Sequence, residues 1–325
     1  MNDVEELKQF AAVHARTQGI TPQQSEAVLS RITTDDGSES GSWAGEWTRA
    51  AADHEAAGRL LDACRHYTMA RFPFVDGPAR EHALRKAVET FGKAGTGLER
   101  LDVGGIRCYA KGLGLGKPAV ILLGGIVSIK EQWAPLLLQL GDLGFAGIVT
   151  ELPQAGENTL PYDEHSWQMF STLIDAIGAD EVYAMAMSFA GHLALRCATT
   201  DKRIKGVLTV GAPTREFFTD QAWRAQLPRV TVDTLAHLTG GADLGGWGLT
   251  EDELSSLDIP VAYVASTRDE IIPPADISLL RTEVTGLQLL ENDDVHGSPE
   301  HTQVTGPWLV AALRAMRDDL REDGQ

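Results

Sequence analysis

The sequence is poor in cysteine, with three in 325 residues: Cys64, Cys108 and Cys197. No two of them stand at Cys-x-x-Cys spacing. A disulfide framework or a cysteine-based zinc site needs more cysteines at closer spacing. We therefore predict three buried, reduced thiols without a chemical role.

Positive charge is also scarce, because 28 lysines and arginines face 46 aspartates and glutamates, which gives a formal net charge of -18. No run of basic residues interleaved with aromatics reverses this balance locally. Such a chain repels a phosphate backbone. The composition therefore excludes nucleic acid as the expected partner.

Long apolar runs are missing as well, since no stretch approaches the roughly 20 apolar residues of a membrane span. The start MNDVEELKQF lacks the basic and apolar regions of a signal peptide. We expect a cytoplasmic protein with no membrane partner.

Histidines such as His14 and His237 have no carboxylate or cysteine at ligand spacing, so we predict neither a metal nor a cofactor. The expected partner is a small-molecule substrate, and a homodimer is left open.

Residues 1–97 contain only helical patterns, with apolar residues three and four positions apart in segments such as VEELKQFAAVHA. The polar, turn-rich stretch from Thr33 to Trp43 predicts a loop between two of these helices. We interpret residues 1–97 as a helical N-terminal cap domain that roofs the substrate pocket.

Residues 98–325 show a different pattern, in which short apolar runs ending in glycine or proline alternate with amphipathic segments. This alternation predicts an α/β fold with a mostly parallel sheet of eight strands. Gly104 and Gly105 predict an antiparallel hairpin between the first two strands. The strands are expected within residues 100–104, 106–113, 118–125, 146–153, 181–187, 205–213, 259–266 and 287–293. Helices are expected at 129–140, 164–177, 189–199, 275–284 and 304–320, with a helical insertion at 214–247.

The stretch AMAMSFAGHLALRCA places Ser188 between the fifth strand and a helix, with the small residues Ala186 and Ala190 two positions to either side. A nucleophilic serine at a sharp strand-to-helix turn needs small neighbours at these two positions. Taken alone, the pentapeptide is equally compatible with a serine that caps the helix.

Two later strand ends favour the nucleophile. STRDEIIPP follows the seventh strand and contains Asp269, and NDDVHGSPEH follows the eighth and contains His296. The chain order serine, acid, histidine is that of α/β-hydrolase triads. We predict Ser188, Asp269 and His296 as the catalytic residues.

An oxyanion hole is expected at the end of the third strand, in ILLGGIVS. The pair Gly124-Gly125 frees the backbone to turn its amides toward the serine, and the predicted donors are the amides of Ile126 and Phe189. A plain turn at the end of a strand is the alternative for the glycine pair. The residues expected to contact substrate are Gly125, Trp133, His192, Phe217 and Trp223.

Other acids and histidines near the strand ends suit structural roles. His301 lies before the last helix and suits a surface or capping role. Asp276 fits the first turn of a helix, where a carboxylate favours the helix dipole. The pair Asp293-Asp294 fits a solvated turn.

The chain resembles the FrsA-like branch of the α/β-hydrolases, a family that includes 2,6-dihydropseudooxynicotine hydrolase and fungal polyketide-shortening hydrolases. The similarity lies in YTMARFPFVDGPAREHALRKAVETF, in LLGGIVSIKEQW, in ELPQAGE and in the turn around Ser188. It implies a Ser188-Asp269-His296 triad beneath a helical cap. The chain departs from the family pattern at Ala186 and Ala190, which stand for glycines, at Glu151, which stands for an aspartate, and at Gln154, Ala155 and His192.

These features predict a serine hydrolase of a small, largely apolar carbonyl compound. The resemblance implies cleavage of a carbon-carbon bond in a β-diketone or aryl ketone, or of an ester, through an acyl-enzyme. The excess of negative charge favours a neutral or cationic substrate. A biosynthetic cyclase or acyl-transfer enzyme of a polyketide-type pathway is the alternative enzyme, and a binding protein without catalysis is the alternative class.

Overall fold

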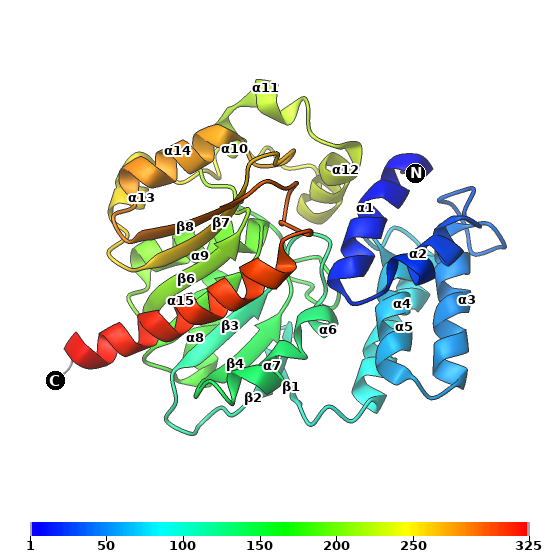
Figure 1. The fold of residues 1–325 in the computed structure, drawn as a ribbon, viewed down its shortest axis with the longest axis horizontal. Coiled ribbons are helices and arrows are strands. Elements are labelled where there is room, and N and C mark those ends of the chain that lie inside the picture. The colour runs from blue at the N-terminus through cyan, green and yellow to red at the C-terminus, as the bar shows by residue number, and fades with distance from the viewer. Residues whose placement is uncertain (1, 324–325) are drawn as a thin grey trace.

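The computed structural model describes residues 2–323 around one sheet of eight strands in the order β1-β2-β4-β3-β5-β6-β7-β8 (Figure 1). β2 runs antiparallel to β1 and to β4, and the other neighbours are parallel. The strands are β1 (Glu99–Val103), β2 (Ile106–Lys111), β3 (Ala119–Leu123), β4 (Ala146–Thr150), β5 (Val182–Ala186), β6 (Ile204–Val210), β7 (Val261–Ser266) and β8 (Leu287–Asn292). The predicted α/β fold, its mostly parallel eight-stranded sheet and the glycine hairpin are confirmed.

The central strands are apolar on both sides because the sheet is covered on both faces. Every residue of β3, β4 and β5 is buried. On β3, Ile121 and Leu123 belong to one core, while Val120 and Leu122 belong to another. The parallel strands all end at one edge of the sheet, so the loops that follow them meet there.

Ten helices follow the first strands in the described chain. They are α6 (Lys130–Trp133), α7 (Leu136–Leu140), α8 (Gln168–Ile177), α9 (Phe189–Thr200), α10 (Glu216–Thr219), α11 (Gln221–Arg224), α12 (Arg229–Thr239), α13 (Glu251–Ser255), α14 (Pro274–Glu283) and α15 (Thr302–Asp323). Several of them, such as α7, α9 and α15, pack on the sheet. The single helix expected over 129–140 is wrong, because the chain forms α6 and α7 on either side of Pro135, which has no amide hydrogen to donate. The segment 214–247, expected to be helical, contains α10, α11 and α12.

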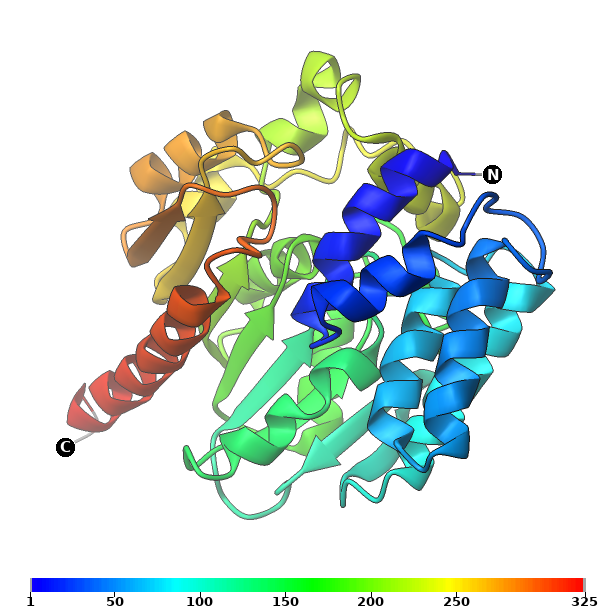
Figure 2. The ribbon, with the colours of Figure 1, turned by 45° about the vertical axis from the view of Figure 1, so that its right-hand side comes forward.

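Five helices precede the sheet: α1 (Val4–Thr17), α2 (Pro22–Leu29), α3 (Trp43–Ala56), α4 (Leu60–Arg71) and α5 (Pro78–Lys93). A core of their own contains Trp43, Trp47 and Phe72, all nearly inaccessible. Figure 2 shows α3, α4 and α5 side by side, with α1 lying apart from them toward α12. Val230 of α12 belongs to the same core, so α1 and α12 meet although about 220 residues separate them in the chain.

None of the helices described has the length and apolar content that a bilayer crossing demands.

Cys64, Cys108 and Cys197 are free and buried, as expected. Burial raises the pKa of the Cys197 thiol to about 11, which keeps this group protonated near neutral pH.

Candidate active site

Ser188 occupies the turn between β5 and α9 with φ 53° and ψ -129°, a conformation that residues with a side chain rarely adopt. Ala186 and Ala190 are fully buried on either side of it. A Cβ on Gly125 would lie 3.1 Å from the Cβ of Ser188, so a side chain at this position would crowd the serine. The serine does not cap α9 through its side chain. The local backbone therefore presents the Ser188 hydroxyl at the edge where the parallel strands end.

His296 and Asp269 form a hydrogen-bonded chain with this hydroxyl. Ser188 Oγ lies 2.9 Å from His296 Nε2, and His296 Nδ1 lies 3.0 Å from both carboxylate oxygens of Asp269. His296 follows β8 and Asp269 follows β7, so three separate strand ends contribute the three side chains. The structure thus brings together the residues that the sequence singled out.

The loops that carry the acid and the histidine are held by further hydrogen bonds. Asp269 Oδ1 accepts from the amides of Ile271 and Ile272, at 2.9 and 2.8 Å. The His296 amide donates to a Glu270 carboxylate oxygen at 3.0 Å. These contacts fix the rotamer of Asp269 and the position of the imidazole before any ligand binds.

The His296 imidazole lies against the carboxylate of Asp269, and their charges interact strongly. Burial acts to lower the pKa of His296, but the negative charge and hydrogen bond of Asp269 outweigh it and raise the pKa above its ordinary value. The imidazole is therefore a stronger base than a free histidine, which suits a group that accepts a proton from a serine.

Ile126 and Phe189 both line the cavity beside Ser188. Neither N–H has a backbone hydrogen-bond partner within the described chain. Phe189 is the first residue of α9, where an amide has no partner in its own helix. Two unoccupied donors next to a serine hydroxyl can receive an oxygen that acquires negative charge.

The competing acids and histidine have other partners. His301 Nδ1 lies 2.9 Å from Asp294, and His301 is not among the residues that line the space at Ser188. Asp294 is buried and also accepts from the Glu300 amide, so the solvated turn expected there is wrong for this residue. Asp276 lies in the first turn of α14 and is also buried, because it accepts hydrogen bonds from the start of the 214–247 segment.

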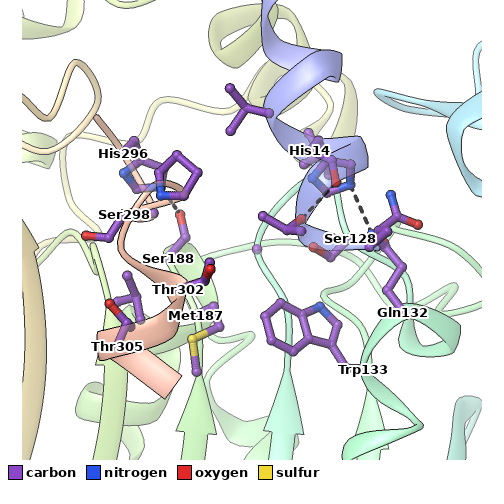
Figure 3. Close-up of a pocket in the computed structure, with 18 of the residues that line it drawn as sticks. His14, Ser128, Gln132, Trp133, Met187, Ser188, His296, Ser298, Thr302 and Thr305 are labelled. Atoms are coloured by element: carbon purple, nitrogen blue, oxygen red, sulfur yellow. Dashed lines mark hydrogen bonds between the residues drawn. The ribbon is translucent and has the colours of Figure 1, made fainter. Parts of the chain in front are cut away.

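A cavity of about 1230 Å³ opens in front of Ser188. Gly125 and Trp133, two of the residues predicted to contact substrate, line it. Helices α1 and α12 contribute to its walls through residues such as Val13 and Thr231. Figure 3 shows Ser188 and His296 on one side of this space, with His14, Gln132 and Trp133 on the other.

Three residues expected to contact substrate do not line this cavity, and these predictions need correction. His192 is buried against the Phe218 ring, with ring centroids 4.5 Å apart. Phe217 is fully buried and packs edge-on against Phe189. Trp223 turns its indole toward the backbone oxygen of Ile271, to which Nε1 donates at 2.8 Å.

Other residues line the cavity that the sequence did not single out, notably His14 and Glu270. His14 Nε2 lies 3.0 Å from the Gln132 amide nitrogen. Burial, together with the charge of Arg71, lowers the pKa of His14 to about 3, so this imidazole is neutral. Phe10, Val13 and His14 follow helical spacing on one face of α1, and this was the only signal in the sequence that could have indicated them.

The described residues contain no group of three or more histidine, cysteine or acidic side chains that could hold a metal ion. Within the same part of the chain, no lysine or arginine lines the cavity, whereas Glu6 and Glu270 do. The hydrogen-bonded Ser188 and His296 can supply nucleophilic attack and proton transfer in this mostly apolar space.

Comparisons with known proteins give consistent results. The sequence profile described as "alpha/beta hydrolase fold" matches residues 118–231. Esterase FrsA of Photobacterium profundum is 22% identical, with 91% of this chain and 85% of that protein aligned. Esterase FrsA of Vibrio vulnificus is 23% identical, with 81% of this chain and 73% of that protein aligned.

Two solved structures are also similar. AbyA5 is 46% identical and superposes with a TM-score of 0.92, covering 98% of this chain and 95% of that chain. The 2,6-dihydroxy-pseudo-oxynicotine hydrolase is 21% identical with a TM-score of 0.63, covering 82% of this chain and 86% of that chain. At this lower identity the likeness concerns the fold alone.

Proposed function

This chain belongs to the α/β-hydrolase family and resembles its FrsA-like branch, and on that premise we propose that it is a serine-dependent hydrolase of a small, largely apolar carbonyl compound. The observation that carries the proposal is the hydrogen-bonded chain from Ser188 through His296 to Asp269. It lies beside the unoccupied amides of Ile126 and Phe189.

The first half of the reaction forms an acyl-enzyme. Ser188 Oγ attacks the carbonyl carbon while His296 Nε2 takes the hydroxyl proton, and Asp269 stabilises the imidazolium that results. The carbonyl oxygen becomes an anion and accepts hydrogen bonds from the two free amides. The carbonyl then re-forms, the leaving group departs, and His296 returns the proton to it.

The second half regenerates the serine. Water enters, His296 removes one of its protons, and the resulting hydroxide attacks the acyl carbon. Collapse of the second tetrahedral intermediate releases a carboxylic acid and returns the proton to Ser188 Oγ. The products together contain the substrate plus one water.

The bond cleaved is proposed to be a carbon-carbon bond beside a ketone, or an ester bond. A carbanion leaves only if a second carbonyl or an aromatic hydroxyl delocalises its charge, so the substrate of a carbon-carbon cleavage must supply that group. An apolar cavity that has carboxylates but no lysine or arginine among its described lining residues disfavours an anionic substrate. A neutral or cationic ketone fits best.

We further propose that residues 1–97 act as a cap domain on the catalytic domain 98–325. Phe10, Val13 and His14 of α1 line the cavity together with Val230 and Thr231 from the segment 214–247. A roof of this kind excludes water and so strengthens the electrostatic interactions at the oxyanion donors.

A second candidate is a cyclase or acyl-transfer enzyme that uses the same side chains without hydrolysis. The apolar lining of the cavity favours it, because water is then a poorer acyl acceptor than a bound second substrate or a second group of the same substrate. In the simplest version of this second candidate, His296 and Ser188 only transfer protons and no acyl-enzyme forms.

Labelling with a fluorophosphonate tests whether Ser188 is an activated nucleophile. The proposal expects stoichiometric modification of Ser188, found by mass spectrometry of the digested protein, and none in Ser188→Ala. Ser128→Ala, which removes another serine that lines the cavity, is the matched control and should label normally. An intact wild-type protein that resists labelling would support the second candidate in its proton-transfer form.

A further inference from the structure

The cavity does not end at the catalytic residues but continues along the sheet as a groove between α7 and α15. Leu122 of β3 and Met185 of β5 form its floor. Leu136 and Leu140 line it from the α7 side. Leu309, Val310 and Leu313 line it from the α15 side. We refer to these seven residues and the space between them as the α7–α15 groove.

The groove is continuous with the space at Ser188. Met187, the residue before the serine, lines the same cavity, as do Thr302 and Thr305 at the start of α15. Figure 3 shows Thr302, Thr305 and Met187 below Ser188, with Trp133 facing them across the space. A molecule whose carbonyl lies at Ser188 can therefore extend into the groove without leaving the cavity.

Polarity changes along this path. Thr302 and Thr305 lie nearest to Ser298 and the catalytic loop, whereas the described lining residues of α15 after them are Gly306, Pro307, Leu309, Val310 and Leu313. On the α7 side Gln139 is polar and exposed, which places it at the rim. The groove thus offers hydroxyl groups near the reacting centre and almost only hydrocarbon beyond it.

The groove is hollow and has a defined far end. Gly306 lines the cavity, and a Cβ added to this exposed glycine would meet no atom within 4 Å, so a side chain does not obstruct the space beside it. The helix between Thr302 and Leu313 is about 16 Å long at 1.5 Å per residue. Arg317 on α15 donates to the backbone oxygen of Leu143 at 2.6 Å, which ties the two sides together beyond Leu313.

We propose that the α7–α15 groove binds an unbranched or lightly branched apolar chain that is part of the substrate. The inference deepens the proposed function and rests on it for the position of the carbonyl at Ser188. Because the groove is continuous with the cavity at Ser188, the chain that it binds belongs to the substrate. A compact aromatic ketone would fill only the space under α1 and α12 and would make no contact with the apolar side chains of the groove.

Binding of unreactive 2-alkanones, from 2-hexanone to 2-dodecanone, tests this inference by calorimetry on the intact protein. These ketones have one carbonyl and no group that can leave. The affinity is expected to rise about fourfold for each added methylene, the gain for burying one methylene group. It should level off once the chain reaches the end closed by Arg317.

Pairs of tryptophan variants, one inside the groove and one outside it, test where the alkyl chain of the ketone binds. Val310→Trp fills the groove from α15, whereas Val304→Trp adds the same bulk to an exposed residue of that helix outside the cavity. Leu136→Trp and Leu138→Trp are the equivalent pair on α7. Val310→Trp and Leu136→Trp should weaken binding of 2-dodecanone at least tenfold and leave 2-hexanone unchanged, and the two control variants should match the wild type.

The inference is overturned if affinity does not depend on chain length, or if the groove variants bind 2-dodecanone as tightly as their controls. Two groove variants on opposite walls keep the test decisive if one of them fails to fold. Because the ketones are not turned over, a protein that gains affinity with chain length but resists the fluorophosphonate would retain the groove and lose the hydrolase proposal. A protein that reacts with the fluorophosphonate but shows no gain in affinity with chain length would retain the hydrolase proposal and lose the groove.

Discussion

The guanidinium of Arg71, at the end of α4, donates a hydrogen bond to the backbone oxygen of Val127, the residue after the proposed oxyanion donor Ile126. Arg71 is buried, and a second hydrogen bond joins it to the oxygen of Pro73. A side chain from the N-terminal helices thus holds the backbone beside Ser188. Arg71 is in this view a positioning residue that acts through the Ile126 amide.

Replacing Arg71 with methionine should lower kcat about 10- to 100-fold, less than the 10²- to 10³-fold loss that follows removal of an oxyanion donor. KM should change little, because Arg71 does not line the cavity. Added guanidinium ion should restore part of the kcat of Arg71→Ala, a rescue that a general loss of packing would not show. A parallel loss in kcat and thermal stability without rescue would contradict the positioning role.

Lys130 is the centre of a buried ionic cluster behind the same loop. Its ammonium lies 3.1 Å from Glu131, 3.2 Å from Glu151 and 2.8 Å from Glu157, and its side chain is inaccessible to solvent. Lys130→Met would leave buried carboxylates without their partner and should destabilise the protein by about 3–5 kcal/mol. Lys202→Met removes an exposed ion pair with Asp258 and should cost about 0–1 kcal/mol. Equal shifts in the midpoint of urea unfolding would disprove the cluster's role.

The three side chains proposed to be catalytic, Ser188, His296 and Asp269, should differ in their contributions. Ser188→Ala and His296→Ala are each expected to lower kcat on the order of 10⁶-fold, and Asp269→Asn about 10⁴-fold, by analogy with losses measured in other triads. His301→Ala is the matched control for the base, because it removes a nearby histidine that bonds to Asp294. The assignment of the base fails if His301→Ala, rather than His296→Ala, abolishes labelling of Ser188.

The pH dependence follows from the state of His296. The imidazole must be neutral to accept the serine proton, and Asp269 raises its pKa above its ordinary value. Activity should therefore fall as the pH drops through that raised pKa, so the acid limb of kcat/KM should lie above pH 6.5, the ordinary histidine value. In Asp269→Asn the raising charge is gone, and the residual activity should show its acid limb at lower pH. If the acid limb of kcat/KM stays at the same pH in Asp269→Asn, the carboxylate of Asp269 is not what raises the pKa of His296.

The strands, the hairpin and the three strand ends whose side chains meet at Ser188 could be predicted from the sequence, because each depends on local pattern. An apolar run, a glycine pair or a short loop after a strand carries its own signal. Ser188, Asp269 and His296 were each found from the loop that follows one strand. Their mutual distances required the structure.

The walls of the cavity could not be predicted in the same way. His14 meets Gln132 across 118 positions of chain, and no local pattern indicates such a contact. Phe217 and His192 were mistaken for lining residues because an apolar or aromatic side chain near a strand end is buried equally well in the core or against a ligand. The buried cluster around Lys130 was missed for the opposite reason, since charged side chains are expected at the surface.

Product analysis in heavy-oxygen water directly tests whether Ser188 hydrolyses its substrate through an acyl-enzyme. The wild-type protein and Ser188→Ala would be incubated with a neutral β-diketone that carries a long alkyl chain and with the corresponding ester. One heavy oxygen is expected in a newly formed carboxylic acid, together with release of a ketone from the diketone or an alcohol from the ester, and Ser188→Ala should yield neither product. Conversion of a substrate by the wild-type protein without release of a carboxylic acid and without uptake of heavy oxygen would contradict this mechanism.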